Sequence, residues 1–133
     1  MPKDSIDTNL IIRLITGAPT SQSHLAWQFL ANSDSLHHLS IIALSETTYV
    51  LEKIYHYSRN SIITKLTDFL STFDAVLEYD HTLINLTLPY YQAHPSLSFN
   101  DCLLAFDAEL THSEPLFTFD QKLSRQHPSA AHL

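Results

Sequence analysis

The feature that most constrains the fold of this chain is an alternation between two kinds of hydrophobic pattern. In the longer segments apolar residues recur at the spacing of one helix face, and short apolar runs stand between these segments. Alternating helices and strands predict an α/β domain with a short, mostly parallel sheet of about four to five strands and helices on both faces. The length of 133 residues predicts a single domain over 1–133.

The element boundaries follow from the same pattern and from residues that stop helices. A helix that carries Leu10, Ile11, Leu14 and Ile15 is expected to end before Gly17. Further helices are predicted at about 21–31, 44–57, 60–72, 81–93 and 99–111. Strands are predicted to end near Ile6 and to cover 39–43, 75–79 and 116–119.

Composition excludes several classes of protein. Cys102 is the only cysteine, so an internal disulfide and a cysteine-based zinc site are excluded, and the single glycine excludes Gly-rich phosphate loops. No apolar run reaches the ~20 residues of a membrane span and the start of the chain lacks a secretory signal, so we expect a cytoplasmic protein with no membrane segment. The formal charge of -7 argues against a protein that coats nucleic acid nonspecifically, but not against a nuclease with bound cations.

Asp7 and Asp120 are predicted to lie at the carboxyl ends of strands, where parallel sheets bind their ligands. Each directly follows an apolar residue of a predicted strand, Ile6 and Phe119 respectively. The alternative interpretation is an N-cap, because Asp is among the best capping residues. Both interpretations stay open for each of the two acids.

Glu46 and Asp101 are two further candidates, each expected in the first turn of a helix. Glu46 borders an apolar helix face, and Asp101 opens a helix that is apolar nearly all round, so we expect both to point toward packed protein. For Glu46 the alternative is an acid that only interacts with the helix dipole. For Asp101 it is a first-turn acid of a helix that Ser98 or Asn100 begins.

Several carboxylates that converge repel one another, and a divalent cation is the usual means of holding them ionised together. Ligands that are all oxygen favour Mg²⁺ or Mn²⁺ over zinc. Such an ion activates water and stabilises the departing oxygen of a phosphodiester. The four acids therefore indicate a metal-dependent phosphodiesterase.

The chain resembles a PIN-domain ribonuclease, most like the VapC-type toxins of bacterial toxin-antitoxin pairs. The resemblance rests on Asp7-Thr8-Asn9 before an apolar helix, on Ser45-Glu46, and on Asp101, which opens an apolar helix and is followed nineteen residues later by the last acid of Thr118-Phe119-Asp120. The first strand departs from the family, because it reads Lys3-Asp4-Ser5-Ile6 where the family is strongly apolar.

The resemblance implies a PIN-like three-layer α/β/α fold in which Asp7, Glu46, Asp101 and Asp120 hold Mg²⁺ or Mn²⁺. It implies that Thr118 helps to position the acids or water, and that RNA is hydrolysed endonucleolytically. Asn9, Arg13 and Lys122 are the residues expected to contact the substrate. It also implies a homodimer and a cognate antitoxin.

Other residues give weaker indications of chemistry. His37 and His38 are adjacent, and adjacent residues on a strand point to opposite faces, so they do not favour one shared metal and are expected to be surface histidines. Cys102 is expected to pack as a small hydrophobe. Exposed base stacking by Tyr55, Tyr57 or the Tyr90-Tyr91 pair is less expected than core or dimer packing.

Two classes of function remain open from sequence. One is the metal-dependent endoribonuclease, as a toxin or as an RNA maturation or decay nuclease without an antitoxin. The other is a catalytically silent PIN-like module that binds protein. The presence of all four acids favours the enzyme.

Overall fold

The structure is a computed structural model that describes residues 1–2 and 4–133. These residues form two compact units, Met1–Tyr79 and Asp80–Leu133. Lys3, which the sequence places in the first strand, lies outside the described residues. No helix in the described part of the chain is long and apolar enough to cross a membrane.

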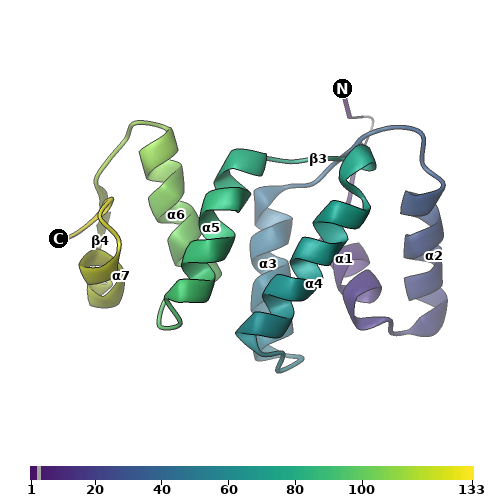
Figure 1. The fold of residues 1–133 in the computed structure, drawn as a ribbon, viewed down its shortest axis with the longest axis horizontal. Helices are drawn as coiled ribbons and strands as arrows, with labels where there is room; N and C mark the ends of the chain where they lie inside the picture. Colours follow the sequence, from purple (N-terminus) through teal and green to yellow (C-terminus); the bar gives the residue numbers. More distant parts are fainter. Residues whose placement is uncertain (3) are drawn as a thin grey trace. The chain divides into compact units, whose positions relative to one another are not determined.

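The first unit combines helices α1 to α4 (Figure 1) with a three-stranded parallel sheet. The strands lie in the order β1-β2-β3, and each adjacent pair is parallel. In chain order the elements are β1 (Asp4–Ser5), α1 (Thr8–Thr16), α2 (Thr20–Ala31), β2 (His37–His38), α3 (Ile41–Lys53), α4 (Arg59–Thr72), a 3₁₀ turn (Asp74–Val76) and β3 (Leu77–Glu78).

Helix α1 is the centre of the first unit, because it packs against α2, α3 and α4. Its residues Ile11 and Ile12 are almost completely buried. The helix ends where the sequence predicts, at Gly17, whose φ of 70° lies in the left-handed region that glycine adopts without steric cost. The Gly17 amide donates to the Arg13 carbonyl at 2.9 Å and closes the last turn.

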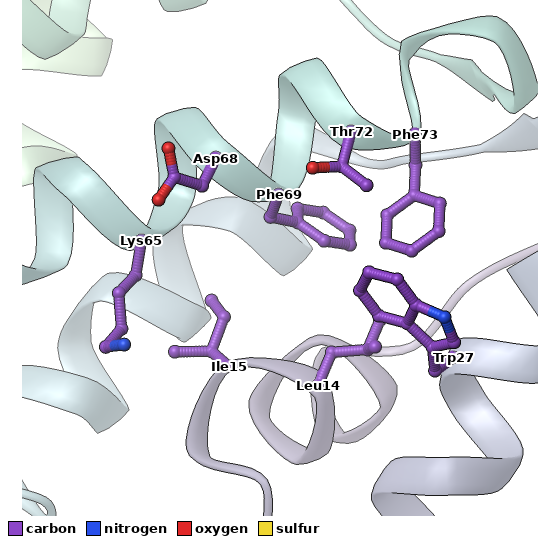
Figure 2. A pocket seen from close by; sticks show the side chains of 8 residues that line it. All are labelled: Leu14, Ile15, Trp27, Lys65, Asp68, Phe69, Thr72 and Phe73. Carbon is purple, nitrogen blue, oxygen red and sulfur yellow. The ribbon is translucent and has the colours of Figure 1, made fainter. Parts of the chain in front are cut away.

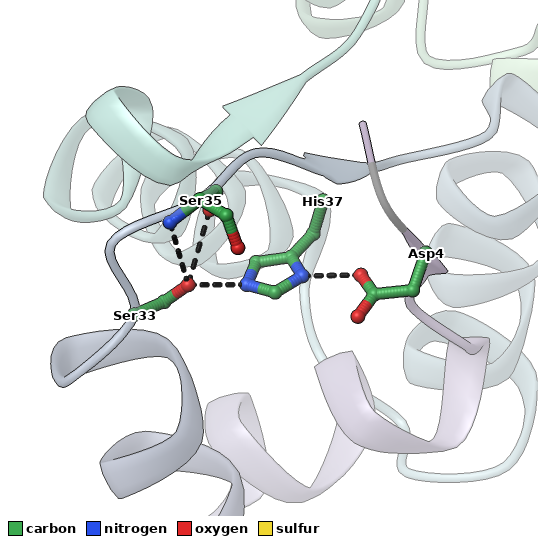
Figure 3. A network of polar contacts seen from close by, with 4 residues as sticks. All are labelled: Asp4, Ser33, Ser35 and His37. Carbon is green, nitrogen blue, oxygen red and sulfur yellow. Dashed lines mark hydrogen bonds and ion pairs between the residues drawn. The ribbon is translucent and has the colours of Figure 1, made fainter. Parts of the chain in front are cut away.

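A buried histidine connects the start of the chain to the loop before β2 (Figure 3). The His37 ring is 3% exposed, and its Nδ1 pairs with the Asp4 carboxylate while its Nε2 lies 2.6 Å from the Ser33 hydroxyl. The Ser33 hydroxyl also donates to the Ser35 carbonyl at 3.0 Å and accepts from the Ser35 amide at 3.3 Å. Because β1 is only two residues long, these side-chain contacts supplement the few hydrogen bonds that a strand of that length makes.

The second unit contains α5 (His81–Ala93), α6 (Phe99–Leu110), β4 (Leu116–Thr118), α7 (Gln121–Gln126) and β5 (Ala130–His132). Helices α5 and α6 pack against each other (Figure 1). Strands β4 and β5 form a separate two-stranded parallel sheet with Thr118 opposite His132.

The last segment of the second unit is held against α5 and α6 by aromatic rings around His127. This imidazole is 1% exposed and contacts the rings of Tyr90 and Phe106, with centroids 4.7 Å and 4.5 Å away. The Ser129 amide donates to its Nδ1 at 3.1 Å, so the neutral ring carries its proton on Nε2. That Nε2 is buried without a hydrogen-bond partner among the described residues.

Burial lowers the pKa of His127 below its ordinary value of 6.5. The charges of Glu109 and Glu114 raise this pKa, and the charge of His94 lowers it further, but burial is the largest cause. Burial also raises the pKa of Tyr90, with a smaller contribution from Cys102. The Tyr90 hydroxyl donates to the Gln126 carbonyl, next to His127. At a given pH His127 is therefore less protonated in the folded state than a histidine in water.

The observed elements confirm the α/β class and parallel strands, with differences at particular boundaries. The predicted strand at 39–43 is wrong: the strand is His37–His38, and α3 begins at Ile41, because the Ser40 hydroxyl accepts from the Ile42 amide at 3.1 Å and caps the helix. The strands pair as two sheets of three and two. Helix α7 and strand β5 were not predicted.

Replacing a central residue of the first unit tests how far its stability depends on α1. Ile11→Ala removes a completely buried side chain, so we expect the free energy of unfolding to fall by about 2–5 kcal/mol. Leu25→Ala on α2 is the matched control, because Leu25 is 66% exposed and its loss should change stability by less than about 0.5 kcal/mol. Urea unfolding followed by circular dichroism measures both. Equal effects of the two substitutions would contradict the packing.

The buried His127 predicts a pH dependence of stability. Its pKa is lower in the folded state, so the unfolded chain binds more protons between that pKa and 6.5, and the free energy of unfolding should fall as pH falls through this window. His127→Asn keeps an acceptor for the Ser129 amide but does not titrate, so the decrease between pH 7.5 and pH 5.5 should be smaller. His24→Gln, at an exposed position of α2, is the control. An unchanged pH dependence in His127→Asn would show that another group is responsible.

Candidate functional site

Asp7 lies between β1 and α1 and caps the helix. Its backbone is extended, with φ of -91° and ψ of 157°, and its Oδ1 accepts from the Thr8 amide at 2.7 Å. Its carbonyl accepts from the Leu10 amide at 3.1 Å, which begins α1. The Ile6 amide still donates to the His38 carbonyl, so Asp7 follows directly after the last sheet hydrogen bond of this strand. The capping interpretation of Asp7 is therefore confirmed, and the side chain is exposed.

Glu46 is connected to the start of α1 through Thr8. The Thr8 hydroxyl donates to Glu46 Oε2 at 3.3 Å, while the Thr8 amide donates to Asp7. Thr8 is 8% exposed, so its two hydrogen bonds are held in a packed position between α1 and α3. Because α3 begins at Ile41, Glu46 lies in the second turn, and the prediction of a first-turn acid is wrong. The prediction that Glu46 points toward packed protein is also wrong, because this residue is exposed. The structure thus brings Asp7 and Glu46 to one place in the first unit.

Asp101 lies in the first turn of α6, as predicted, and Ser98 is the residue that caps this helix. The Ser98 hydroxyl accepts from the Asp101 amide at 3.0 Å. The prediction that Asp101 faces packed protein is wrong, because its side chain is only half-buried. The reason is that α6 is not enclosed all round: Leu104, one turn after Asp101, is 47% exposed.

Asp120 caps α7, and Thr118 holds its backbone. Asp120 Oδ1 accepts from the Leu123 amide at 3.0 Å, and the Thr118 hydroxyl accepts from the Asp120 amide at 2.9 Å. Strand β4 ends at Thr118, one residue earlier than predicted. The sequence predicts that Thr118 positions the acids or water; its hydroxyl contacts the backbone amide of Asp120, and the positioning role stays a prediction.

The three residues predicted to contact substrate differ in their surroundings. Asn9, in the first turn of α1, and Lys122, in the first turn of α7, are exposed. Arg13 donates through Nε to Gln22 Oε1 of α2 at 2.7 Å, which holds the guanidinium against α2. Asn9 and Lys122 are therefore the more accessible of the three.

Each unit holds two of the four candidate acids: Asp7 and Glu46 in the first, Asp101 and Asp120 in the second. Within residues 1–2 and 4–133, no three His, Cys, Asp or Glu side chains form a group that could hold a metal. The donors are all carboxylates, and each acid is exposed or half-buried, which suits hydrated Mg²⁺ or Mn²⁺ in its chemistry. The convergence of all four acids stays a prediction.

A small hollow of about 160 Å³ opens in the first unit between α1, α2 and α4 (Figure 2). The ring of Trp27 packs edge-on against Phe73, with centroids 5.0 Å apart, and Phe69 packs beside Phe73. Lys65 and Asp68 add two charges to the lining. The hollow contains none of the four candidate acids, and its apolar lining suits an apolar side chain rather than a phosphodiester.

The functional link that sequence reasoning missed is Thr8. It stands inside Asp7-Thr8-Asn9, the motif that carried part of the resemblance, but its hydroxyl was assigned no role. A hydroxyl residue directly after a capping acid was the available signal, although its partner on α3 depends on tertiary packing.

The two adjacent histidines have different surroundings. The expectation of surface histidines is wrong for His37, which is buried and pairs with Asp4, whereas His38 is exposed and its Nδ1 lies 3.3 Å from Glu78 Oε2. Cys102 is buried in α6. Tyr91 is completely buried and packs edge-on against Phe99, as expected for a core aromatic.

In the comparison with known protein families, the model of the PIN domain matches residues 5–127. PIN domains are typically nucleases, and they generally use divalent metals. The helices and parallel strands described above agree with the three-layer α/β/α fold of this family. Comparisons with curated proteins and with solved structures gave no match. Because the family model covers most of the chain and extends through both units, this chain belongs to the PIN domain family.

Proposed function

We propose that this protein is an endoribonuclease that hydrolyses RNA phosphodiester bonds with Mg²⁺ or Mn²⁺, and that it acts as the toxin of a toxin-antitoxin pair. Asp7, Glu46, Asp101 and Asp120 are the proposed metal ligands, and Thr118 is the proposed positioning residue. The family match supports nuclease activity in general. The metal, the RNA substrate and the toxin role are proposals that go beyond that match.

The observation that carries the proposal is that the four carboxylates are accessible to solvent and that two of them keep an oxygen free of the helix cap. Asp7 and Asp120 use Oδ1 to cap their helices, which leaves the second oxygen of each group for another ligand. The caps fix each side chain at the start of a helix, where the local field favours an anion. None of the four acids is enclosed in protein, so each is accessible to solvent.

The residues of the chain have separate tasks in the proposed reaction. Thr8 orients Glu46 through its hydroxyl and Asp7 through its amide. Thr118 fixes the backbone at Asp120. Lys122 and Asn9 are exposed cationic and amide groups that suit contacts to phosphate and sugar oxygens. No side chain has to act as a nucleophile in this scheme.

The carboxylate ligands would hold a hard divalent cation, which when bound lowers the pKa of water and stabilises charge on the departing oxygen. Removal of the cation by EDTA is therefore expected to stop cleavage. Metal binding has its own readout: calorimetric titration with Mn²⁺ measures it without any RNA substrate.

The proposed partners are RNA, a cognate antitoxin and a second copy of this chain. We propose these partners because the chain resembles VapC-type toxins. That resemblance names a subfamily, whereas the family match identifies only the PIN domain. A role in RNA maturation or decay without an antitoxin would use the same acids. The cytoplasmic location expected from the sequence stays a prediction.

Asp101→Asn tests the proposed reaction, because it removes one charge with little change of shape. We expect RNA cleavage to fall by about 100-fold or more, since loss of even a supporting partner of a metal site costs about 10- to 100-fold. Asp107→Asn is the matched control, because Asp107 is an exposed acid on the same helix α6 and is not a proposed ligand. Cleavage of total RNA with Mg²⁺, with Mn²⁺ and with EDTA provides the measurement, and thermal unfolding confirms that both variants fold.

The result also separates the enzyme from the catalytically silent module. That alternative is a PIN-like protein that binds another protein and does not cleave RNA. Full activity of Asp101→Asn would overturn the assignment of Asp101. If the wild-type protein neither cleaves RNA nor binds Mn²⁺ at millimolar concentration, the silent module is the correct description.

A further inference from the structure

Two aromatic side chains beside Asp120 are unusually exposed. Phe117 is 64% exposed and Phe119 is 76% exposed, and they are the most exposed aromatic residues in the part of the chain that the structure describes. A single exposed apolar residue is normal on a protein surface. Two phenyl rings within three residues are a larger apolar exposure, which more often marks a binding surface.

The two rings alternate along the chain with Thr118 and Asp120, two residues of the proposed site. Thr118 stands between them and accepts the hydrogen bond from the Asp120 amide. Phe119 directly precedes Asp120, so their Cα atoms are about 3.8 Å apart. A phosphodiester bound at Asp120 would therefore place one of its nucleosides within reach of the Phe119 ring.

The backbone that carries the rings is held in place from the C-terminal side. Strand β4 pairs with β5, and the Leu133 amide donates to the Thr118 carbonyl at 3.0 Å. The Phe119 ring meets the His132 ring edge to face, with centroids 6.3 Å apart and planes at 88°. Phe119 thus exposes most of its surface while the His132 ring supports it. Because this contact already restricts the side chain, binding costs less conformational entropy.

The surrounding side chains favour a nucleic acid over a protein partner. Polar residues are next to both rings in the chain, because Thr118 lies between the two phenylalanines and Asp120 and Gln121 follow them. Lys122 and Arg125 on α7 are exposed cations that follow within six residues of Phe119. Aromatic rings together with nearby cations are the combination that binds single-stranded nucleic acid, because bases stack on the rings and phosphates pair with the cations.

We propose that Phe119, assisted by Phe117, is a stacking platform for an unpaired nucleobase of the RNA substrate. This inference rests on the proposed ribonuclease function and assigns to Phe119 a role in substrate binding and positioning that is separate from the metal ligands. Both faces of a base are covered in a duplex, so the platform acts only on unpaired bases. Its contribution appears in the affinity for RNA.

The test is a comparison of Phe119→Ala, Phe119→Trp and Phe117→Ala with the wild-type protein. The probe is an unstructured RNA oligonucleotide of mixed sequence, and the same oligonucleotide in a duplex is the comparison. Phe119→Ala should raise KM by about 5- to 150-fold with a smaller change in kcat, because stacking on an aromatic ring contributes that factor per base. Phe119→Trp keeps an aromatic ring and should have a KM close to that of the wild-type protein. Leu25→Ala, on α2, removes a similarly exposed apolar side chain and should leave KM unchanged.

Direct binding separates a failure of this inference from a failure of the proposed function. Asp101→Asn protein, with and without Phe119→Ala, is titrated with the labelled oligonucleotide in fluorescence anisotropy. Weaker binding on loss of Phe119, together with an absence of cleavage by the wild-type protein, would support the platform and reject the nuclease. Cleavage with an unchanged KM in Phe119→Ala would overturn the platform alone.

The rings could instead form a contact between two copies of the chain. Sedimentation of the wild-type protein and of Phe119→Ala distinguishes this outcome. Loss of a dimer in Phe119→Ala, with unchanged RNA affinity per chain, would assign the rings to a protein interface and overturn the platform. An unchanged oligomeric state with reduced affinity supports it.

Discussion

Burial of apolar helix faces is the constraint on which the rest of this structure depends. Every described strand is two or three residues long, so the sheets contribute few hydrogen bonds and cannot by themselves fix the fold. In the first unit α1 packs against three helices through residues such as Ile11 and Ile12. In the second, the α5 and α6 pair and the rings around His127 hold the last segment. The positions of the candidate acids follow from this helix packing.

The capping and catalytic interpretations of the same acids are compatible. Asp7 and Asp120 each begin a helix and each use one carboxylate oxygen to do so. A carboxylate has two oxygens, so a cap can hold the group in position while the other oxygen remains available to a cation or to water. Two threonines also hold candidate acids in position. The Thr8 hydroxyl donates to the Glu46 carboxylate, and the Thr118 hydroxyl accepts from the Asp120 amide. A helix start therefore serves both as a structural boundary and as the support of a candidate ligand.

Sequence patterns were most reliable where a helix carries its own stop or start. The end of α1 at Gly17 and the bounds of α5 were predicted because local residues determine them. The region around Leu39 was misassigned, because a short apolar run has the same appearance in a buried strand and in a helix. That error moved the predicted start of α3 and placed Glu46 one turn too early. Asp101 was expected to be buried because its helix is rich in apolar residues, yet periodicity does not tell which neighbours cover each face.

The sequence by itself determined the α/β class and the family motifs, and it named four candidate acids whose role stays a prediction, because these depend on local periodicity and on residues that are adjacent in the chain. Only the tertiary structure decided which distant groups meet. The contact of Thr8 with Glu46 spans 38 positions, and the exposure of Phe117 and Phe119 depends on which elements do not cover them. The burial of His127 depends in the same way on packing against α5 and α6. Contacts between distant residues arise from packing of side-chain surfaces in three dimensions, which a one-dimensional pattern does not encode.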